Sequence, residues 1–350
     1  DSNISESTLK VVAKNTPAVV RVYTVDCADI ELGIGEYSEI VPACGIGLGS
    51  GALISSDGYI VTNGHVVSFL PQYMLATEVA FENEDVIVPI LTVYLLAKGY
   101  TYDEAIDGIY YAIDTDPESV LTVAYSVALS FPDEYISSVT NNEKIISVQL
   151  ANTPPEVNKD AYYPGDIFQV GGGVVDAEFI DEDFNPRDLL SADGFTASDI
   201  ALLKADDSYY EFPFIELGSA SELVTGSEIT VIGFPGIVEN ELVDKSESKP
   251  TATKGIVSAI RTAAGSGNKL IQSDVSITNG NSGGPAYNDK GEVIGIATFG
   301  VSTDTGVEAV KFMMEINSAK EFMNEINVHN AGGLLDEKYN NALESFWNRD

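Results

Sequence analysis

The sequence of 350 residues predicts a mainly β fold into which a helical segment is inserted. Short apolar runs bounded by turn residues predict the strands, at 19–25, 49–55, 59–62 and 200–203. The dipeptide Asp57-Gly58 is the tight turn expected between two of these strands. Helix caps gather instead between residues 101 and 134, so we expect helices in that part of the chain.

Three capping patterns define the expected helices. A capping box at 101–104 precedes an apolar stretch, and the Asp-Pro-Glu sequence at 116–118 predicts the start of a second helix. The Pro-Asp-Glu sequence at 132–134 predicts the start of a third. We therefore expect residues 69–142 to form a helical insertion. A lid, an exosite, a subunit contact and a packed appendage without catalytic effect are all compatible with it.

The two cysteines of the chain, Cys27 and Cys44, bracket the loop expected between the strands at 19–25 and 49–55. The ends of adjacent antiparallel strands lie within bridging distance, so we expect a disulfide between the two cysteines. Closing a loop of this size stabilises a protein by about 3 kcal/mol. Two free buried thiols are the alternative.

The chain carries 54 acidic and 18 basic side chains, which gives a formal net charge of −36. Such a surface repels nucleic acid and anionic membranes, and it attracts basic segments of substrates or partners. The longest apolar stretch, 86–97, is shorter than the ~18 residues that a membrane helix needs. We therefore expect no nucleic-acid partner and no membrane span.

The motif that points most directly to chemistry is Gly-Asn-Ser-Gly-Gly-Pro at 280–285. A serine on a glycine-rich turn can supply a nucleophile beside backbone N–H groups that stabilise an oxyanion. Such a serine needs a base. His65 follows a predicted strand, whereas His329, the other histidine, lies in a polar stretch, so His65 is the candidate. Asp199 precedes the apolar run 200–203 and is the candidate carboxylate that orients the histidine.

The stretches around His65, Asp199 and Ser282 together resemble the trypsin-like serine proteases, and most closely the HtrA/Deg family. Asn281, directly before the serine, points to that family, as does the run Ser-Gly-Ala-Leu-Ile-Ser-Ser-Asp-Gly-Tyr-Ile-Val-Thr-Asn-Gly-His at 50–65. The resemblance implies a chymotrypsin-like fold of two six-stranded antiparallel β-barrels, with the helical insertion in the N-terminal lobe. The implied parts are an N-terminal lobe at 1–68 and 143–207, a C-terminal lobe at 208–317 and C-terminal helices at 318–350.

The resemblance also assigns a role to each motif residue. Ser282 would be the nucleophile, His65 the general acid and base, and Asp199 the orienting carboxylate. The N–H groups of Gly280 and Ser282 would form the oxyanion hole. No metal and no organic cofactor is expected.

Substrate contacts follow from the same resemblance. Ser276, six residues before the nucleophile, would lie at the base of the primary specificity pocket. An uncharged residue there offers nothing to pair with Lys or Arg, so small or medium apolar P1 residues are favoured. The expected contacts to the substrate backbone come from Thr298, Phe299 and Gly300.

The resemblance therefore implies a serine endopeptidase that acts on proteins or peptides. The alternative is a latent or inactive protease-fold module, of binding or chaperone type, gated by the helical insertion. Members of the HtrA family normally carry a PDZ domain after the second barrel, but residues 318–350 predict helices instead. The sequence starts at Asp1, which indicates an exported and processed chain or an engineered start. We expect an extracytoplasmic location, secreted, periplasmic or at the cell surface, and leave a homo-oligomer open.

Overall fold

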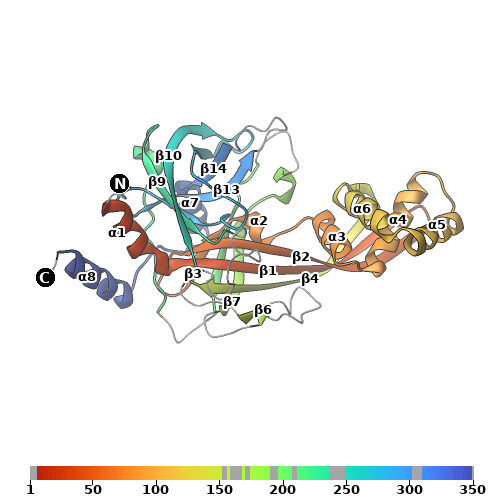
Figure 1. Cartoon of the computed structure of the whole chain (residues 1–350), viewed down its shortest axis with the longest axis horizontal. Helices are drawn as coiled ribbons and strands as arrows, with labels where there is room; N and C mark the ends of the chain where they lie inside the picture. The colour runs from red at the N-terminus through yellow and green to blue at the C-terminus, as the bar shows by residue number, and fades with distance from the viewer. Residues whose placement is uncertain are drawn as a thin grey trace. The chain divides into compact units, whose positions relative to one another are not determined.

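The computed structural model describes residues 6–151, 156–157, 168–169, 174–189, 196–206, 211–235, 249–301 and 310–348. Its strands close two antiparallel β-barrels of six strands each (Figure 1). The strand order is β1-β2-β3-β8-β7-β4 in the first barrel and β10-β11-β14-β13-β12-β9 in the second. The predicted fold class, a mainly β protein of two six-stranded barrels with added helices, is confirmed.

The first barrel contains the strands predicted from apolar runs. Its members are β1 (Val19–Ile34), β2 (Tyr37–Leu53), β3 (Tyr59–Thr62), β4 (Ile136–Leu150), β7 (Val174–Asp183) and β8 (Ile200–Ala205). The short strand β3 lies between β2 and β8, with Val61 opposite both Ala52 and Leu202. These three side chains are fully buried. The ends of β3 and β8 thereby come together, and these ends carry the candidate histidine and aspartate.

The second barrel carries the candidate serine. Its strands are β9 (Glu228–Gly233), β10 (Thr251–Thr262), β11 (Lys269–Ser273), β12 (Pro285–Tyr287), β13 (Val293–Val301) and β14 (Val310–Glu315). Its core includes Val231, Ile271 and Ile294, all almost fully buried. A separate two-stranded sheet pairs β5 (Glu156–Val157) with β6 (Phe168–Gln169).

The chain forms two compact units. The first contains Asp1–Tyr23, Gly47–Val67 and Ile146–Asp350, and it holds all the candidate catalytic residues. The second contains Thr24–Ile46 and Ser68–Ile145. The second unit therefore includes the turn of the β1–β2 hairpin and the adjoining parts of both strands, as well as the helical insertion.

Four helices make up most of the second unit: α3 (Pro71–Ala80), α4 (Glu84–Ala97), α5 (Tyr102–Thr115) and α6 (Pro117–Leu129). The predicted caps of α5 and α6 are present, since Thr101 and Glu104 form a complete capping box and Asp116 accepts from the Ser119 N–H. The helices share one hydrophobic core with the hairpin, in which Ile30 and Leu32 are fully buried.

The prediction of a third helix, starting at residue 132, is wrong. The sequence at Pro132 starts only a short 3-10 turn (Asp133–Tyr135), after which the chain enters β4. A Pro-Asp-Glu sequence is only a local start signal, and the residues that follow must supply the apolar period of a helix. In β4 they are largely polar and exposed up to Lys144, without such a period.

The β1–β2 hairpin is longer than the sequence predicts. The expected loop around Cys27 and Cys44 is absent, because β1 and β2 continue to a tight turn in which Gly35 has a φ of +63°. The two cysteines lie on these facing strands, with their Cα atoms 4.0 Å apart, and form a disulfide. The disulfide therefore staples a hairpin and does not close a loop.

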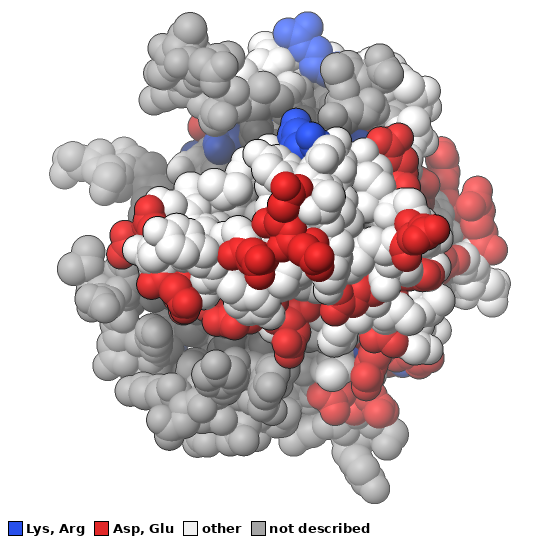
Figure 2. All heavy atoms as spheres, turned by 90° about the vertical axis from the view of Figure 1, so that its right-hand side faces the viewer, with Lys and Arg blue, Asp and Glu red and all other residues white. Residues whose placement is uncertain are grey.

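The helical unit is strongly acidic. Residues 68–145 contain 13 acidic and two basic side chains. Figure 2 shows Asp and Glu distributed across the face that it views, with few Lys or Arg. The exposed members on the helices and their connections are Glu82, Glu84, Asp85, Asp103, Glu104, Asp107, Asp114, Asp116, Glu118, Asp133 and Glu134.

The remaining helices are α1 (Glu6–Asn15), α2 (Gly64–Val67), α7 (Ile316–Glu325) and α8 (Leu334–Asn348), with 3-10 turns at Thr16–Ala18, Pro186–Leu189 and Ala220–Glu222. Helix α8 packs on its own unit, where Asp336 accepts from the Phe214 N–H at 3.0 Å and the Tyr339 hydroxyl donates to the Ala13 carbonyl at 2.8 Å. None of the described helices is long and apolar enough to cross a membrane.

Candidate active site

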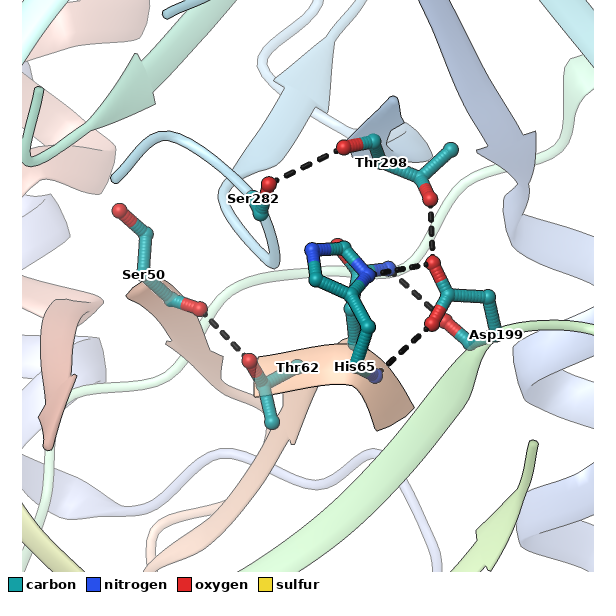
Figure 3. Close-up of polar contacts among 7 residues, drawn as sticks. Ser50, Thr62, His65, Asp199, Ser282 and Thr298 are labelled. Carbon is teal, nitrogen blue, oxygen red and sulfur yellow. Dashed lines mark hydrogen bonds and ion pairs between the residues drawn. The ribbon is translucent and has the colours of Figure 1, made fainter. Parts of the chain in front are cut away.

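His65 is held by two contacts with one carboxylate. Strand β3 ends at Thr62, and the chain turns through Asn63 into the single-turn helix α2, which carries His65. The backbone N–H of His65 donates to Asp199 Oδ1 at 3.0 Å, and its ring Nδ1 lies 2.8 Å from Asp199 Oδ2 (Figure 3). A carboxylate only accepts hydrogen bonds, so Nδ1 carries the proton. The lone pair is then on Nε2, which faces Ser282 in Figure 3.

Asp199 is fixed from several directions. It directly precedes β8, with a φ of +48°, a left-handed conformation that Asp tolerates better than most residues. Its side chain is 1% exposed. The Asn63 amide donates to the Asp199 carbonyl at 2.8 Å, and the Thr298 hydroxyl donates to Asp199 Oδ2 in a short hydrogen bond. The carboxylate therefore has its position set by partners from both barrels.

The environment of His65 raises its pKa. Burial of the ring alone lowers that pKa, but the negative charge of Asp199 and the hydrogen bond from Nδ1 outweigh the burial. The net shift is upward from the ordinary value of about 6.5. A histidine can accept a proton from a hydroxyl and return it to a leaving amine, most effectively when its pKa lies near the working pH.

Ser282 lies on a turn built from glycines. Gly280 and Gly283 have φ values of +92° and +85°, which side-chain-bearing residues rarely adopt. The turn is closed by the Asn281 N–H, which donates to the Thr278 carbonyl at 3.0 Å. At Gly283 a Cβ atom would lie 2.0 Å from the Ser50 carbonyl oxygen, so space also requires glycine there.

The Ser282 hydroxyl does not contact His65. It donates to the Thr298 backbone carbonyl at 3.0 Å, and within the described part of the chain no hydrogen bond joins it to the imidazole. Figure 3 shows the hydroxyl turned toward Thr298, with the ring of His65 beside it. Catalytic hydrogen bonds are often long or misaligned before substrate binds. Transfer of the hydroxyl proton to the ring would require a rotation about the Cα–Cβ bond of Ser282.

Two N–H groups on the turn that carries Ser282 are available for a further hydrogen bond. The N–H groups of Gly280 and Ser282, predicted to form the oxyanion hole, have no protein acceptor among the described residues. Unpaired N–H groups on one tight turn are suited to bind the oxygen of a tetrahedral intermediate. The oxyanion hole of Gly280 and Ser282 stays a prediction.

The residues predicted to contact the substrate lie in different surroundings from one another. Ser276 is exposed, and its backbone carbonyl accepts from the Thr253 hydroxyl at 3.2 Å. Thr298 is buried, and its hydroxyl is committed to Asp199. Phe299 and Gly300 belong to β13, but the surroundings of their side chains lie outside what the structure describes.

Three supporting residues were missed from the sequence. They are Asn63, which holds the Asp199 carbonyl, Ser50, whose hydroxyl donates to the Gly280 carbonyl, and Thr298 in its contact with the carboxylate. Asn63 and Ser50 both lie inside the run 50–65 that carries the resemblance. That run was the available signal for them.

Comparison with known proteins decides the family. Residues 49–296 match the trypsin-like peptidase domain. The chain belongs to this family. The trypsin-like match contains His65, Asp199 and Ser282, and the two barrels have the architecture expected of a chymotrypsin-like fold.

Individual relatives of this trypsin-like domain are HtrA and DegP proteins. The "Probable periplasmic serine endoprotease DegP-like" of Hahella chejuensis is 35% identical over 157 residues, which are 43% of this chain and 31% of that protein. "Serine protease Do-like HtrA" of Bacillus subtilis is 33% identical over 145 residues, 39% of this chain and 30% of that protein. The chain thus spans about a third of the length of these relatives. A solved structure of an HtrA-type protease with a decapeptide is 19% identical, with a TM-score of 0.47 over 91% of this chain and 66% of that one.

Proposed function

We propose that this chain is a serine endopeptidase, with Ser282 as nucleophile, His65 as general acid and base, and Asp199 as the orienting carboxylate. The observation that carries the proposal is the double contact of Asp199 with the His65 backbone and ring, next to a serine on a glycine turn. The names of the two relatives, a probable serine endoprotease and a serine protease, support it.

In the proposed reaction, Ser282 Oγ attacks the carbonyl carbon of the scissile peptide while its proton passes to His65 Nε2. Asp199 stabilises the imidazolium that results. The negative charge that forms on the carbonyl oxygen is bound by the N–H groups of Gly280 and Ser282. His65 then donates its proton to the leaving amine, and an acyl-enzyme remains on Ser282. Attack by water, deprotonated by His65, releases the acid and regenerates the hydroxyl.

For the substrate we propose peptides with small or medium apolar P1 residues. Ser276, the residue expected at the pocket base, carries no charge, so a Lys or Arg of a substrate would find no carboxylate at this residue. Basic segments outside P1 are attracted by the acidic surface, which carries a formal net charge of −36. We propose an extracytoplasmic setting, which the disulfide and the periplasmic relative support.

The second candidate function is a latent protease-fold module. The observation that favours latency is the hydrogen bond from the Ser282 hydroxyl to the Thr298 carbonyl, because it turns the hydroxyl away from His65. We keep the helical insertion at 69–142 as the proposed gate. Removing it would strip Ile30 and Leu32 of their helical partners, so deletion of the insertion is a poor test. A peptide ligand that accelerates labelling of Ser282 is a better indicator of latency.

The test of the main proposal is hydrolysis by the full chain. Wild type should cleave a denatured protein and a short peptide with Ala or Val at P1, and a peptide with Arg at P1 much more slowly. Ser282→Ala should lower kcat by roughly 10⁶-fold. Ser221→Ala is the control serine deletion, since it removes an exposed hydroxyl that is hydrogen-bonded to Ser219 Oγ in the turn before β9, and should keep kcat within a few fold. Equal cleavage by wild type and Ser282→Ala would refute the proposal.

A further inference from the structure

Ser50 is a fully buried serine at a junction between the two barrels of the first unit. It lies near the end of β2, between Gly49 and Gly51, and has 0% of its surface exposed. A buried hydroxyl must satisfy its hydrogen-bonding capacity within the protein. The Ser50 hydroxyl forms hydrogen bonds with two backbone groups from the part of the chain that forms the second barrel.

The hydroxyl of Ser50 acts as donor and as acceptor. Its Oγ donates to the Gly280 carbonyl at 2.7 Å and accepts from the Phe234 N–H, which follows β9, at 2.8 Å. The backbone N–H of Ser50 donates to the Ser282 carbonyl at 2.7 Å. The carbonyl groups of Gly280 and Ser282 are thus both bound by the same residue.

These two carbonyls belong to the residues whose N–H groups form the proposed oxyanion hole. The Gly280 carbonyl is part of the peptide unit between Gly280 and Asn281, which lies directly between the two donor N–H groups. Its other side is held by the Asn281 N–H, which donates to the Thr278 carbonyl at 3.0 Å. Glycine rotates easily about its backbone bonds, so without both bonds this peptide unit is free to turn and carry the donors out of line.

We propose that Ser50 is a positioning residue for catalysis: its side-chain hydroxyl fixes the Gly280–Asn281 peptide so that the N–H groups of Gly280 and Ser282 converge on one point. The inference rests on the proposed function. It assigns the hydroxyl an effect on the transition state, where negative charge develops on the substrate oxygen. The hydroxyl has no effect on the binding of the uncharged substrate.

The chain offers a closely matched control serine. Ser273, at the end of β11, is 4% exposed; its Oγ donates to the Ile256 carbonyl at 3.0 Å and accepts from the Val275 N–H at 2.9 Å. Ser273→Ala therefore removes the same two kinds of bond from a buried site in the second barrel. It leaves the Gly280 peptide untouched.

The experiment compares Ser50→Ala and Ser273→Ala in the full chain, by kcat, KM, the thermal midpoint and affinity for a peptide boronic acid. The boronate forms a tetrahedral adduct whose oxygen occupies the hole. Removing a hole donor outright costs 10²–10³-fold, so displacing it in Ser50→Ala should lower kcat and boronate affinity by about 10- to 100-fold, with KM within about 3-fold. In Ser273→Ala the thermal midpoint should fall by about as much as in Ser50→Ala, but kcat should stay within about 3-fold of wild type.

The results separate the inference from the proposed function. If wild type cleaves peptides and the two variants lose kcat equally, Ser50 is merely structural and the inference is wrong. If wild type neither cleaves peptides nor binds the boronate, the proposed function fails and the inference falls with it. If Ser50→Ala does not fold, Ser50→Cys replaces the hydroxyl by a weak S–H donor, so a smaller loss of kcat at constant KM is expected. A folded Ser50→Cys whose kcat/KM falls through a higher KM at wild-type kcat would also overturn the inference.

Discussion

The Ser282 hydroxyl donates to the backbone carbonyl of Thr298 at 3.0 Å, while the Thr298 hydroxyl donates to Asp199. One residue of β13 therefore touches both the nucleophile and the acid of the proposed triad. The carbonyl holds Ser282 away from His65, and the hydroxyl holds the carboxylate in its contact with the His65 ring. These two contacts can be separated, because only the second depends on the side chain.

Thr298→Val removes the hydroxyl and keeps both the shape and the carbonyl. We expect kcat to fall about 10-fold, because a hydrogen bond to a charged group contributes about 1.5–3 kcal/mol to holding that group. Peptide hydrolysis measures the loss. Thr92→Val in α4 is the control, since it deletes a buried hydroxyl that donates to the Val88 carbonyl at 2.7 Å in the other unit. Equal losses in both variants would contradict the assignment.

The activity should depend on the protonation of His65. Only the neutral ring accepts the proton of Ser282, so kcat/KM should rise with pH along an acidic limb whose apparent pKa lies above 6.5. Asp199→Asn removes the charge that raises the pKa of His65. It should move this limb to lower pH and reduce kcat by roughly 10⁴-fold, as the tautomer is no longer fixed. A limb that stays in place would show that Asp199 does not set the pKa.

The same pair makes a pH-dependent contribution to folding. The pKa of His65 is higher in the folded protein than its ordinary value, so the folded state binds the proton more tightly. This stabilisation is fully present below about pH 6.5 and is lost as the pH rises through the higher folded pKa. His65→Gln should therefore reduce the free energy of unfolding more at pH 5 than at pH 9. Chemical denaturation at the two pH values checks the sign.

Gly283→Ala should prevent the second barrel from closing around the serine. Its Cβ would lie 2.0 Å from the Ser50 carbonyl oxygen and 2.3 Å from Thr62 Oγ1. The loss should exceed about 3 kcal/mol in the free energy of unfolding. Gly267→Ala is the control, because Gly267 has a similar φ of +79° but nothing within 4 Å, so it should cost only the ~1 kcal/mol of a left-handed conformation. Similar losses of unfolding free energy in the two variants would mean that the left-handed conformation, and not the close contacts at Gly283, determines the cost of the substitution.

The candidate catalytic motif was accessible from sequence because its signals are local. A glycine turn around Ser282, a strand end before His65 and a strand start after Asp199 each occupy a few adjacent residues. The contacts that support them are not local, since Ser50 and Gly280 are 230 residues apart and Thr298 and Asp199 are 99 apart. No pattern within one segment can reveal such pairs without the fold.

The extended hairpin was missed for a different reason. Asp29 and Glu31 alternate with the buried Ile30 and Leu32, which is the pattern of a half-buried strand. The position of the cysteines at the expected strand ends favoured a loop instead. The apolar face of this hairpin is covered by the helices of the second unit, and a sequence does not state which segments will cover each other.

The most direct measurement of the central claim is reaction of the full chain with a serine-directed fluorophosphonate, followed by mass spectrometry of the digested protein. We predict a single adduct on the peptide that contains Ser282, formed more slowly below the apparent pKa of His65 and absent from Ser282→Ala. Labelling that persists in Ser282→Ala, or no labelling of the folded wild type with and without a peptide ligand across pH 6–9, would contradict the assignment of Ser282 as the nucleophile.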